Sequence, residues 1–288
     1  MPPLALGLLL VAAVMHATWN LLVKRAREKQ VFTWLALLIG AICYLPVVVF
    51  NPIDLRAIWP FIVCSALVEA IYYFALISAY QYGDFSLIYP IARGAAPAFL
   101  LAWTALFLGE RPRLFGVIGI ILLVLGLMLV GGNAWWELRK QASLRSVSKN
   151  GLALALSVAL CISIYTTIDG AAVRHVDPLP YVVVVMSLAT ILLSPAILRR
   201  YGTSAVAKEW RANWPRILMV GIFNLLAYAL VLFAYTMMRV SYAGAIREVS
   251  VVFAALIGWL YLRETFGALR VAGSVLIFSG ILVIALVG

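Results

Sequence analysis

Two arginines lie inside long apolar runs of the sequence, where a permanent charge is costly. Arg93 stands in the stretch YPIARGAAPAF and Arg247 stands in AGAIREVSVVF. An arginine at the centre of a bilayer costs at least about 2.5–3.5 kcal/mol on insertion scales. Because a guanidinium offers a fork of donors that matches carboxylate and phosphate groups, each arginine predicts either a site for an anionic solute group or a structural ion pair.

Three acids lie within the same kind of apolar run and are candidates to balance these charges, namely Glu69, Asp169 and Glu248. We expect them to neutralise the arginines, to bind the amine of a zwitterion, or to carry a coupling proton. In the purely structural alternative, Arg93 pairs with Glu69 and Arg247 pairs with a nearby carboxylate. The residue types leave both alternatives open.

The first apolar run adds a histidine, a tryptophan and an asparagine. His16 is either a hydrogen-bonding residue between helices or a cavity residue that exchanges a proton. Asn20 follows it by four positions and shares its helical face, which favours the cavity. Trp19 is explained more readily by packing than by binding.

Tyrosines mark two matching helical faces. Glu69 is followed at i+4 and i+11 by Tyr73 and Tyr80, and Asn224 is followed at the same spacings by Tyr228 and Tyr235. Tyrosine gives a cavity an apolar wall that still donates a hydrogen bond. The full set of predicted substrate-binding residues is Arg93, Arg247, Glu69, Tyr73, Tyr80, Asn20, His16, Trp19, Tyr165, Asp169, Asn224, Tyr228 and Glu248.

Helix-breaking residues surround Arg93 more closely than Arg247. Pro90, Gly94 and Pro97 flank Arg93, whereas Gly244 stands near Arg247. Proline weakens the helical hydrogen-bond ladder, and broken membrane helices occur where the freed backbone lines a cavity. The pattern predicts an opened backbone at Arg93 and a milder version at Gly244.

The composition places these residues in a membrane. Of the 288 residues, 65% are hydrophobic and 11% are charged, and the mean hydropathy is +1.07. The net charge of +11 comes from short loops between apolar runs, which indicates membrane orientation and not nucleic-acid binding. Cys43, Cys64 and Cys161 form no C-x-x-C pair, so we expect no metal site and no cofactor.

Apolar runs of about 20 residues suit helical membrane spans. Ten are predicted, at 3–23, 31–50, 58–81, 85–108, 113–132, 150–173, 179–198, 214–238, 241–262 and 267–287. The basic connector 133–149 divides the chain into two five-span halves, 1–132 and 150–288. An odd number of spans inverts the second half relative to the first, so the sequence predicts two inverted repeats around a central cavity.

The two halves also align with each other. At an offset of 154 positions, Arg93 matches Arg247, Glu110 matches Glu264, Gly119 matches Gly273 and Gly126 matches Gly280. The stretches LGERPRLFGVIGIILLVLGLMLV and LRETFGALRVAGSVLIFSGILVI resemble the EamA-type signature of the drug/metabolite transporter superfamily. This resemblance implies a ten-helix carrier of the kind that exports amino acids and other small metabolites, with relatives that carry nucleotide sugars or phosphorylated sugars.

Basic residues also predict an orientation. Loops on one predicted face hold 15 Lys/Arg, and the opposite face holds five, Arg56, Arg111, Arg113, Arg174 and Arg239. The positive-inside rule then places both termini outside the cytoplasm, whereas the family resemblance implies both termini inside.

We therefore expect a multi-pass protein of the plasma membrane, in a bacterium the inner membrane, that acts as a secondary transporter by alternating access. It is expected to export a small zwitterion or organic anion, as a monomer or homodimer. The alternatives are a carrier or flippase for a phosphorylated, phosphonate or lipid-linked substrate, and a membrane receptor or scaffold. No Walker A, H-E-x-x-H or G-x-S-x-G motif is present, so we expect no enzyme.

Overall fold

The computed structural model describes the chain except at residues 25, 83–84, 141–148, 254–255, 257–267 and 288. Side chains are described outside 24–25, 76–91, 131–152, 254–255, 257–267, 270 and 288. Nine helices are bounded in this described part: α1 (Pro3–Lys24), α2 (Lys29–Phe50), α3 (Leu55–Tyr82), α4 (Phe85–Phe107), α5 (Leu114–Lys140), α6 (Lys149–Ala172), α7 (Pro178–Met237), α8 (Val240–Arg247) and α10 (Ala268–Val287).

The described residues form helices and no strand, as predicted for an all-helical membrane protein. Five stretches are long and apolar enough to cross a bilayer, within α1, α2, α3, α6 and α7. Such helices satisfy their own backbone groups, which a lipid environment requires. The described residues do not establish the count of ten spans, which stays a prediction.

Two predicted connectors are helical, which corrects the predicted boundaries. α7 covers both predicted spans 179–198 and 214–238, and the chain between them breaks helical geometry at Gly202, whose φ is 72° and ψ 165°. Glycine adopts this left-handed φ without the steric cost that a Cβ imposes. α5 likewise continues to Lys140, into the connector predicted at 133–149.

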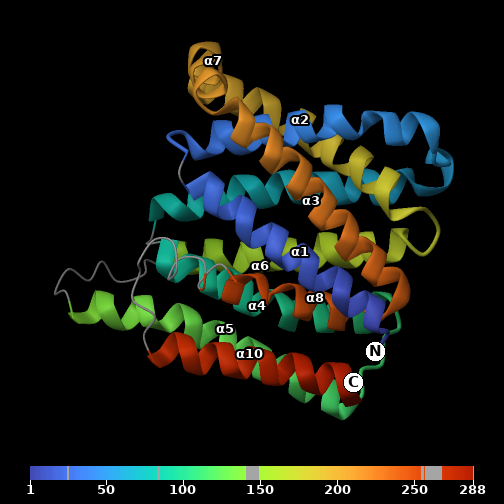
Figure 1. The fold of residues 1–288 in the computed structure, drawn as a ribbon, viewed down its shortest axis with the longest axis vertical. Helices are drawn as coiled ribbons and strands as arrows, with labels where there is room; N and C mark the ends of the chain where they lie inside the picture. The colour runs from blue at the N-terminus through green and yellow to red at the C-terminus, as the bar shows by residue number, and fades with distance from the viewer. Residues whose placement is uncertain (25, 83–84, 141–148, 254–255, 257–267, 288) are drawn as a thin grey trace.

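The helices pack side by side in layers (Figure 1). α5 and α10 lie together at one edge of the bundle, α2 lies against α7 at the other edge, and α1, α3, α4, α6 and α8 lie between them. The two chain ends meet on one side, where the amino group of Met1 lies 3.4 Å from the carbonyl oxygen of Ala285. The first and last helices therefore begin and end on the same face.

Glycines let α5 and α10 approach closely. A Cβ placed on Gly126 would lie 2.6 Å from the carbonyl oxygen of Gly273, and one on Gly119 would lie 2.8 Å from that of Gly280. Gly119 aligns with Gly273 in the repeat, and Gly126 aligns with Gly280. Gly119 thus lies against Gly280, the repeat counterpart of Gly126, and Gly126 lies against Gly273, the repeat counterpart of Gly119. This reciprocal pattern is that of a two-fold contact.

The backbone around the two arginines is the reverse of the prediction. α4 runs unbroken from Phe85 to Phe107 through Arg93 and its prolines. α8 instead ends at Arg247, and the next amides turn back by three residues, with Glu248 N–H bonded to Ala245 O and Val249 N–H bonded to Ile246 O. The opened backbone therefore lies beside Arg247, not beside Arg93, and follows it directly rather than lying at Gly244.

Candidate functional site

The central feature of the bundle is a buried ion pair between the two halves of the chain. Nη1 of Arg93, on α4, donates to both Oε1 and Oε2 of Glu248, at 3.1 Å each. Glu248 is the residue that caps α8, and its side chain is 1% exposed. A charged pair so deep in a membrane protein is costly unless both groups are satisfied, so this site is held by strong mutual contacts.

Two further side chains from separate helices complete the cluster. His16 of α1 lies with Nε2 2.7 Å from Nη2 of Arg93, and Nη2 of Arg247 lies 3.5 Å from Oε1 of Glu248. A guanidinium only donates hydrogen bonds, so Nε2 of His16 is the acceptor and bears no proton in this arrangement. Four residues of the predicted set thus meet at one point, namely His16, Glu248 and the two arginines that the repeat aligns, Arg93 and Arg247.

This geometry decides the partner of Arg93. Among the described residues, the carboxylate that Arg93 binds is Glu248, so the predicted structural pairing with Glu69 is wrong. The predicted pairing of Arg247 with a nearby carboxylate is confirmed, since that carboxylate is also Glu248. One acid therefore serves two arginines.

Some buried polar atoms near the cluster lack a partner in the described part of the chain. They include Oε2 of Glu69, Nε of Arg247 and Nε1 of Trp19. The Trp19 ring packs edge-on against His16, with ring centroids 4.8 Å apart. A buried polar atom without a hydrogen bond is destabilising, so these atoms offer hydrogen-bonding capacity that a solute can use.

Asp169 does not join the arginine cluster. Its Oδ1 accepts a hydrogen bond from the hydroxyl of Tyr181 at 2.7 Å, and its Oδ2 accepts one from the hydroxyl of Tyr228. Asp169 and Tyr181 are both fully buried. The carboxylate therefore ties α6 to α7, and the sequence missed Tyr181 because it belongs to neither tyrosine face.

Four tyrosines form a connected row beside these groups. Tyr72 lies edge-on to Tyr73 at 5.0 Å and to Tyr165 at 6.1 Å, and Tyr165 lies edge-on to Tyr228 at 6.2 Å. Tyr73, Tyr165 and Tyr228 were predicted, whereas Tyr72 was not part of the predicted set. The row joins α3 to α6 and α7 with apolar faces and hydroxyl edges.

The remaining predicted residues are less engaged. The side-chain amide of Asn20 bonds within its own helix, where Nδ2 donates to the carbonyl oxygen of His16 at 2.8 Å. Asn224 is half-buried and has no recorded polar contact among the described residues. The side chain of Tyr80 lies outside the described residues, so its predicted role stays a prediction.

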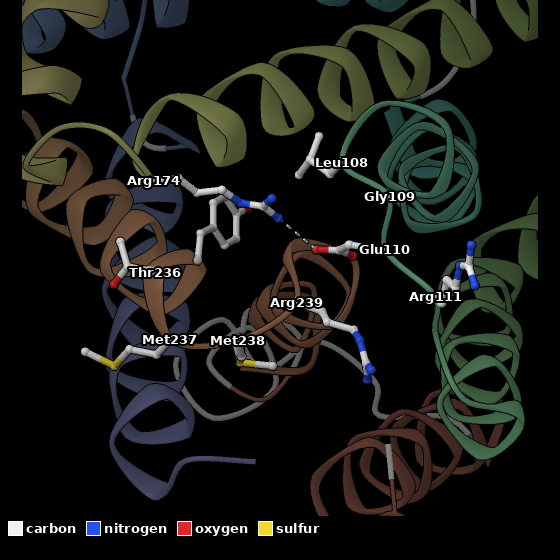
Figure 2. A pocket seen from close by; sticks show the side chains of 10 residues that line it. Leu108, Gly109, Glu110, Arg111, Arg174, Thr236, Met237, Met238 and Arg239 are labelled. Carbon is white, nitrogen blue, oxygen red and sulfur yellow. Dashed lines mark ion pairs between the residues drawn. The ribbon is translucent and has the colours of Figure 1, made fainter.

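An opening of about 680 Å³ lies at one end of the bundle (Figure 2). It is lined by the chain that follows α4, by the end of α6 and by the junction of α7 and α8, at Leu108, Gly109, Glu110, Arg111, Arg174, Tyr235, Thr236, Met237, Met238 and Arg239. Its volume falls in the range of roughly 300–1,000 Å³ that small-molecule sites occupy.

Glu110 organises one wall of this opening. Its Oε1 accepts the backbone N–H of Val240 at 2.6 Å, and its Oε2 accepts both the N–H and the hydroxyl of Ser241. Figure 2 shows Arg174 reaching toward it, at 3.8 Å from Oε1. A carboxylate at a helix N-terminus satisfies free amides and complements the helix dipole, so Glu110 fixes the start of α8.

Tyr235 links the opening to the central cluster. It lines the opening, yet the residue is only 3% exposed and its hydroxyl has no hydrogen-bond partner in the described part of the chain. Arg247 and Glu248 both lie within electrostatic range of it. Tyr235 therefore lines the opening while its hydroxyl is buried inside the bundle.

Comparison with known proteins agrees with these features. A family model described as the EamA-like transporter family matches residues 3–132 and 149–286. The pseudopaline exporter CntI of two Pseudomonas aeruginosa strains, PAO1 and UCBPP-PA14, is 26% identical over 222 residues, which cover 76% of this chain and 72% of the exporter.

A solved crystal structure has the same fold. It superimposes with a TM-score of 0.78, over 99% of each chain and with 21% sequence identity. At this identity the likeness concerns the arrangement of the helices alone.

Proposed function

The chain belongs to the EamA-like transporter family, as its sequence predicted, and on that premise we propose that it is a secondary carrier that exports a small polar metabolite bearing a carboxylate. That it is a multi-pass membrane transporter follows from the family and from its apolar helices. The substrate class, the direction and the mechanism are the proposal.

The observation that carries the proposal is the buried pair of Arg93 and Glu248. Ionisable groups inside a membrane are by default candidates for solute and ion pathways. The pair joins the first half of the chain to the second, and Arg247 shares the same acid. A solute carboxylate that binds the arginines releases Glu248, which is then free to bind a solute amine.

The atoms without partners support a zwitterion or an organic anion. Among the described residues, the buried Nε of Arg247 and the buried Oε2 of Glu69 have no hydrogen-bond partner, so one donor and one acceptor are open to a solute. A solute with one acidic and one basic group satisfies both atoms, whereas a bare cation leaves the donor unsatisfied. The tyrosine row supplies a wall for the apolar part of the solute.

Alternating access between two inverted five-span repeats is the mechanism that we propose. The reciprocal contacts of Gly119 with Gly280 and of Gly126 with Gly273 support it, because an inverted repeat produces such a two-fold contact. The broken backbone after Arg247 also supports it, since discontinuous helices line transporter sites. Export as the direction rests on the similarity to the pseudopaline exporter.

A coupling proton is a further part of the proposal, and His16 is the residue that we assign to it. Its Nε2 accepts from Arg93 only while unprotonated. Protonation therefore separates the two side chains and exposes Arg93 to a solute. Efflux that is unchanged by an imposed pH gradient would overturn proton coupling, but it would not contradict the proposed carrier function.

The experiment that tests the function begins with a thermal-shift screen of the purified protein against amino acids, organic acids and phosphorylated metabolites, because a ligand stabilises the state it binds. Hits are then followed as saturable flux in proteoliposomes. We expect Arg93→Gln and Arg247→Gln to lower kcat/KM by about tenfold or more, the value of one charged hydrogen bond.

Arg56→Gln is the matched control, since Arg56 starts α3 and lies outside the central cluster. It removes the same charge and is expected to leave flux unchanged. Near-normal flux by both central variants would overturn the binding site, and absence of saturable flux for every hit would overturn the carrier.

A further inference from the structure

Three arginines line the opening at the junction of α7 and α8, on the predicted membrane face that holds few basic residues. Arg111, Arg174 and Arg239 line it together with one acid, Glu110. These are three of the five Lys/Arg on their predicted face, against 15 on the opposite face. Orientation in the membrane depends on the richer face, so topology does not account for arginines that converge on one opening.

The acid at the opening does not cancel these charges. The Glu110 carboxylate is occupied by the backbone of Val240 and by both donors of Ser241. Arg174 lies 3.8 Å from it with a side chain 46% exposed, and exposed pairs at this distance contribute little. Its charge is thus directed mainly to the N-terminus of α8.

The arginines retain donors for a ligand. Arg111 is exposed and has no recorded ion pair among the described residues. Arg239 lies over the ring of Tyr242 at 5.2 Å and its Nη1 donates to the hydroxyl of Tyr242 at 3.5 Å, which leaves its other donors for a ligand. The buried hydroxyl of Tyr235, which also lines the opening, has no partner in the described part of the chain, whereas the hydroxyl of Thr236 donates to the carbonyl oxygen of Phe233 at 2.7 Å.

We propose that this opening is a second binding site, which takes the carboxylate or phosphate group of an anionic solute on its way to or from the central cluster. Arginine forks bind such oxyanions through paired charged hydrogen bonds. Tyr235 lines this opening and also belongs to the tyrosine face that the sequence predicts for the central cavity. The inference rests on the proposed function, because a second oxyanion site serves transport only if the solute carries an anionic group.

Methionines report on the two sites separately. Met237 and Met238 line the opening. Met15 precedes His16, and Met128 lies beside Gly94, where an added Cβ would meet its methyl carbon at 2.7 Å. With seven methionines in the chain, methyl NMR of protein labelled with methyl-13C methionine is feasible, and Met237→Leu and Met238→Leu assign the two signals.

The test is a titration of the full-length protein in detergent with inorganic phosphate, against sodium chloride at matched ionic strength. We expect phosphate alone to shift the Met237 and Met238 signals saturably. Arg111→Gln and Arg239→Gln should each weaken this binding by about tenfold, and Arg56→Gln should not. Signals that fail to move, that move equally with chloride, or that move equally in the Arg111 and Arg239 variants would overturn the site.

A lipid headgroup carries the same phosphate chemistry, so a second arm uses nanodiscs with and without phosphatidylglycerol. Shifts caused by phosphatidylglycerol but not by free phosphate would assign the opening to lipid and overturn the solute proposal. The result for the opening can be distinguished from the result for the central cluster. Phosphate shifts that persist in Arg93→Gln support the opening even where flux is lost, and normal flux without shifts overturns the opening alone.

Discussion

Arg93 and Glu248 lie 155 positions apart in the chain, yet one guanidinium nitrogen of Arg93 donates to both carboxylate oxygens of Glu248. The contact joins an unbroken helix in the first half to the residue that follows α8 in the second half. Any movement of the two halves past each other must break or rebuild this pair. The pair is therefore a buried charged contact between the halves, and in the proposed function it is the place where a solute exchanges for a protein group.

The losses of stability from removing the two members of this pair should not be additive. Arg93→Gln and Glu248→Gln each leave an opposite charge buried without its main partner, which costs about 3–5 kcal/mol. The double variant replaces the pair by two neutral amides and leaves Arg247 without its acid, as Glu248→Gln alone already does, so its loss should be smaller than the sum by about 0.5–3 kcal/mol. Unfolding free energies in detergent measure all three, and additive losses would show that the pair is not coupled.

The sequence alone could not predict that Arg93 pairs with Glu248. Composition and spacing identified both arginines and three acids, because charged residues stand out in apolar runs. Which acid meets which arginine depends on how separate helices cross, and periodicity within one helix carries no such information. Glu248 was one of three candidates, and the explicit pairing of Arg93 with Glu69 was wrong.

Glycines at the crossing of α5 and α10 lead to a second prediction. Gly126→Ala places a Cβ 2.6 Å from the carbonyl oxygen of Gly273, so the helices must separate. We expect a loss of about 1–3 kcal/mol, as for other overpacked contacts, seen as a lower melting temperature. Gly7→Ala is the control, since a Cβ at Gly7 meets no atom within 4 Å.

The reciprocal contact sharpens this test. Gly273→Ala should cost about as much as Gly126→Ala, because each glycine faces the carbonyl of the other. The double variant should lose less than the sum, since one separation of the helices accommodates both methyl groups. Equal melting temperatures for Gly126→Ala and Gly7→Ala would contradict the close crossing.

Helix boundaries show a different reason for error. The connector between the predicted spans 179–198 and 214–238 holds good helix formers, and within α7 the chain departs from helical dihedrals at Gly202. Polarity marks where a chain leaves the bilayer, but it does not end a helix. The apolar runs therefore predicted the five described stretches that are long and apolar enough to cross a bilayer, but they predicted the helix ends poorly.

Hydrogen bonds to Asp169 give a third prediction. Tyr181→Phe removes a donor to a fully buried carboxylate, and hydrogen bonds to charged groups contribute about 1.5–3 kcal/mol. Tyr44→Phe is the control, because its hydroxyl makes only a 3.4 Å bond to the carbonyl of Ile222, so its loss should be at most about 0.5–1.5 kcal/mol. Chemical unfolding in detergent compares them.

Tyr228→Phe separates structure from transport at the same carboxylate. It removes the other donor to Asp169 and also alters the tyrosine row, through the contact of Tyr228 with Tyr165. We expect a loss of stability similar to that of Tyr181→Phe together with a change in KM that Tyr181→Phe lacks. Identical kinetics for the two variants would place Tyr228 outside the solute path.

The orientation of the chain in the membrane is the last prediction. Met1 and Ala285 lie side by side, so both termini share one face, the one with five of the loop Lys/Arg against 15 on the other. The positive-inside rule places the richer face in the cytoplasm.

Alkaline phosphatase fused to the C-terminus should therefore be active, and green fluorescent protein fused there should be dark. The same two reporters inserted after Gly202, in the connector of α7 on the richer face, should give the opposite pair of results. A fluorescent C-terminal fusion would instead place the arginine-lined opening in the cytoplasm, where it would receive the exported solute and not release it.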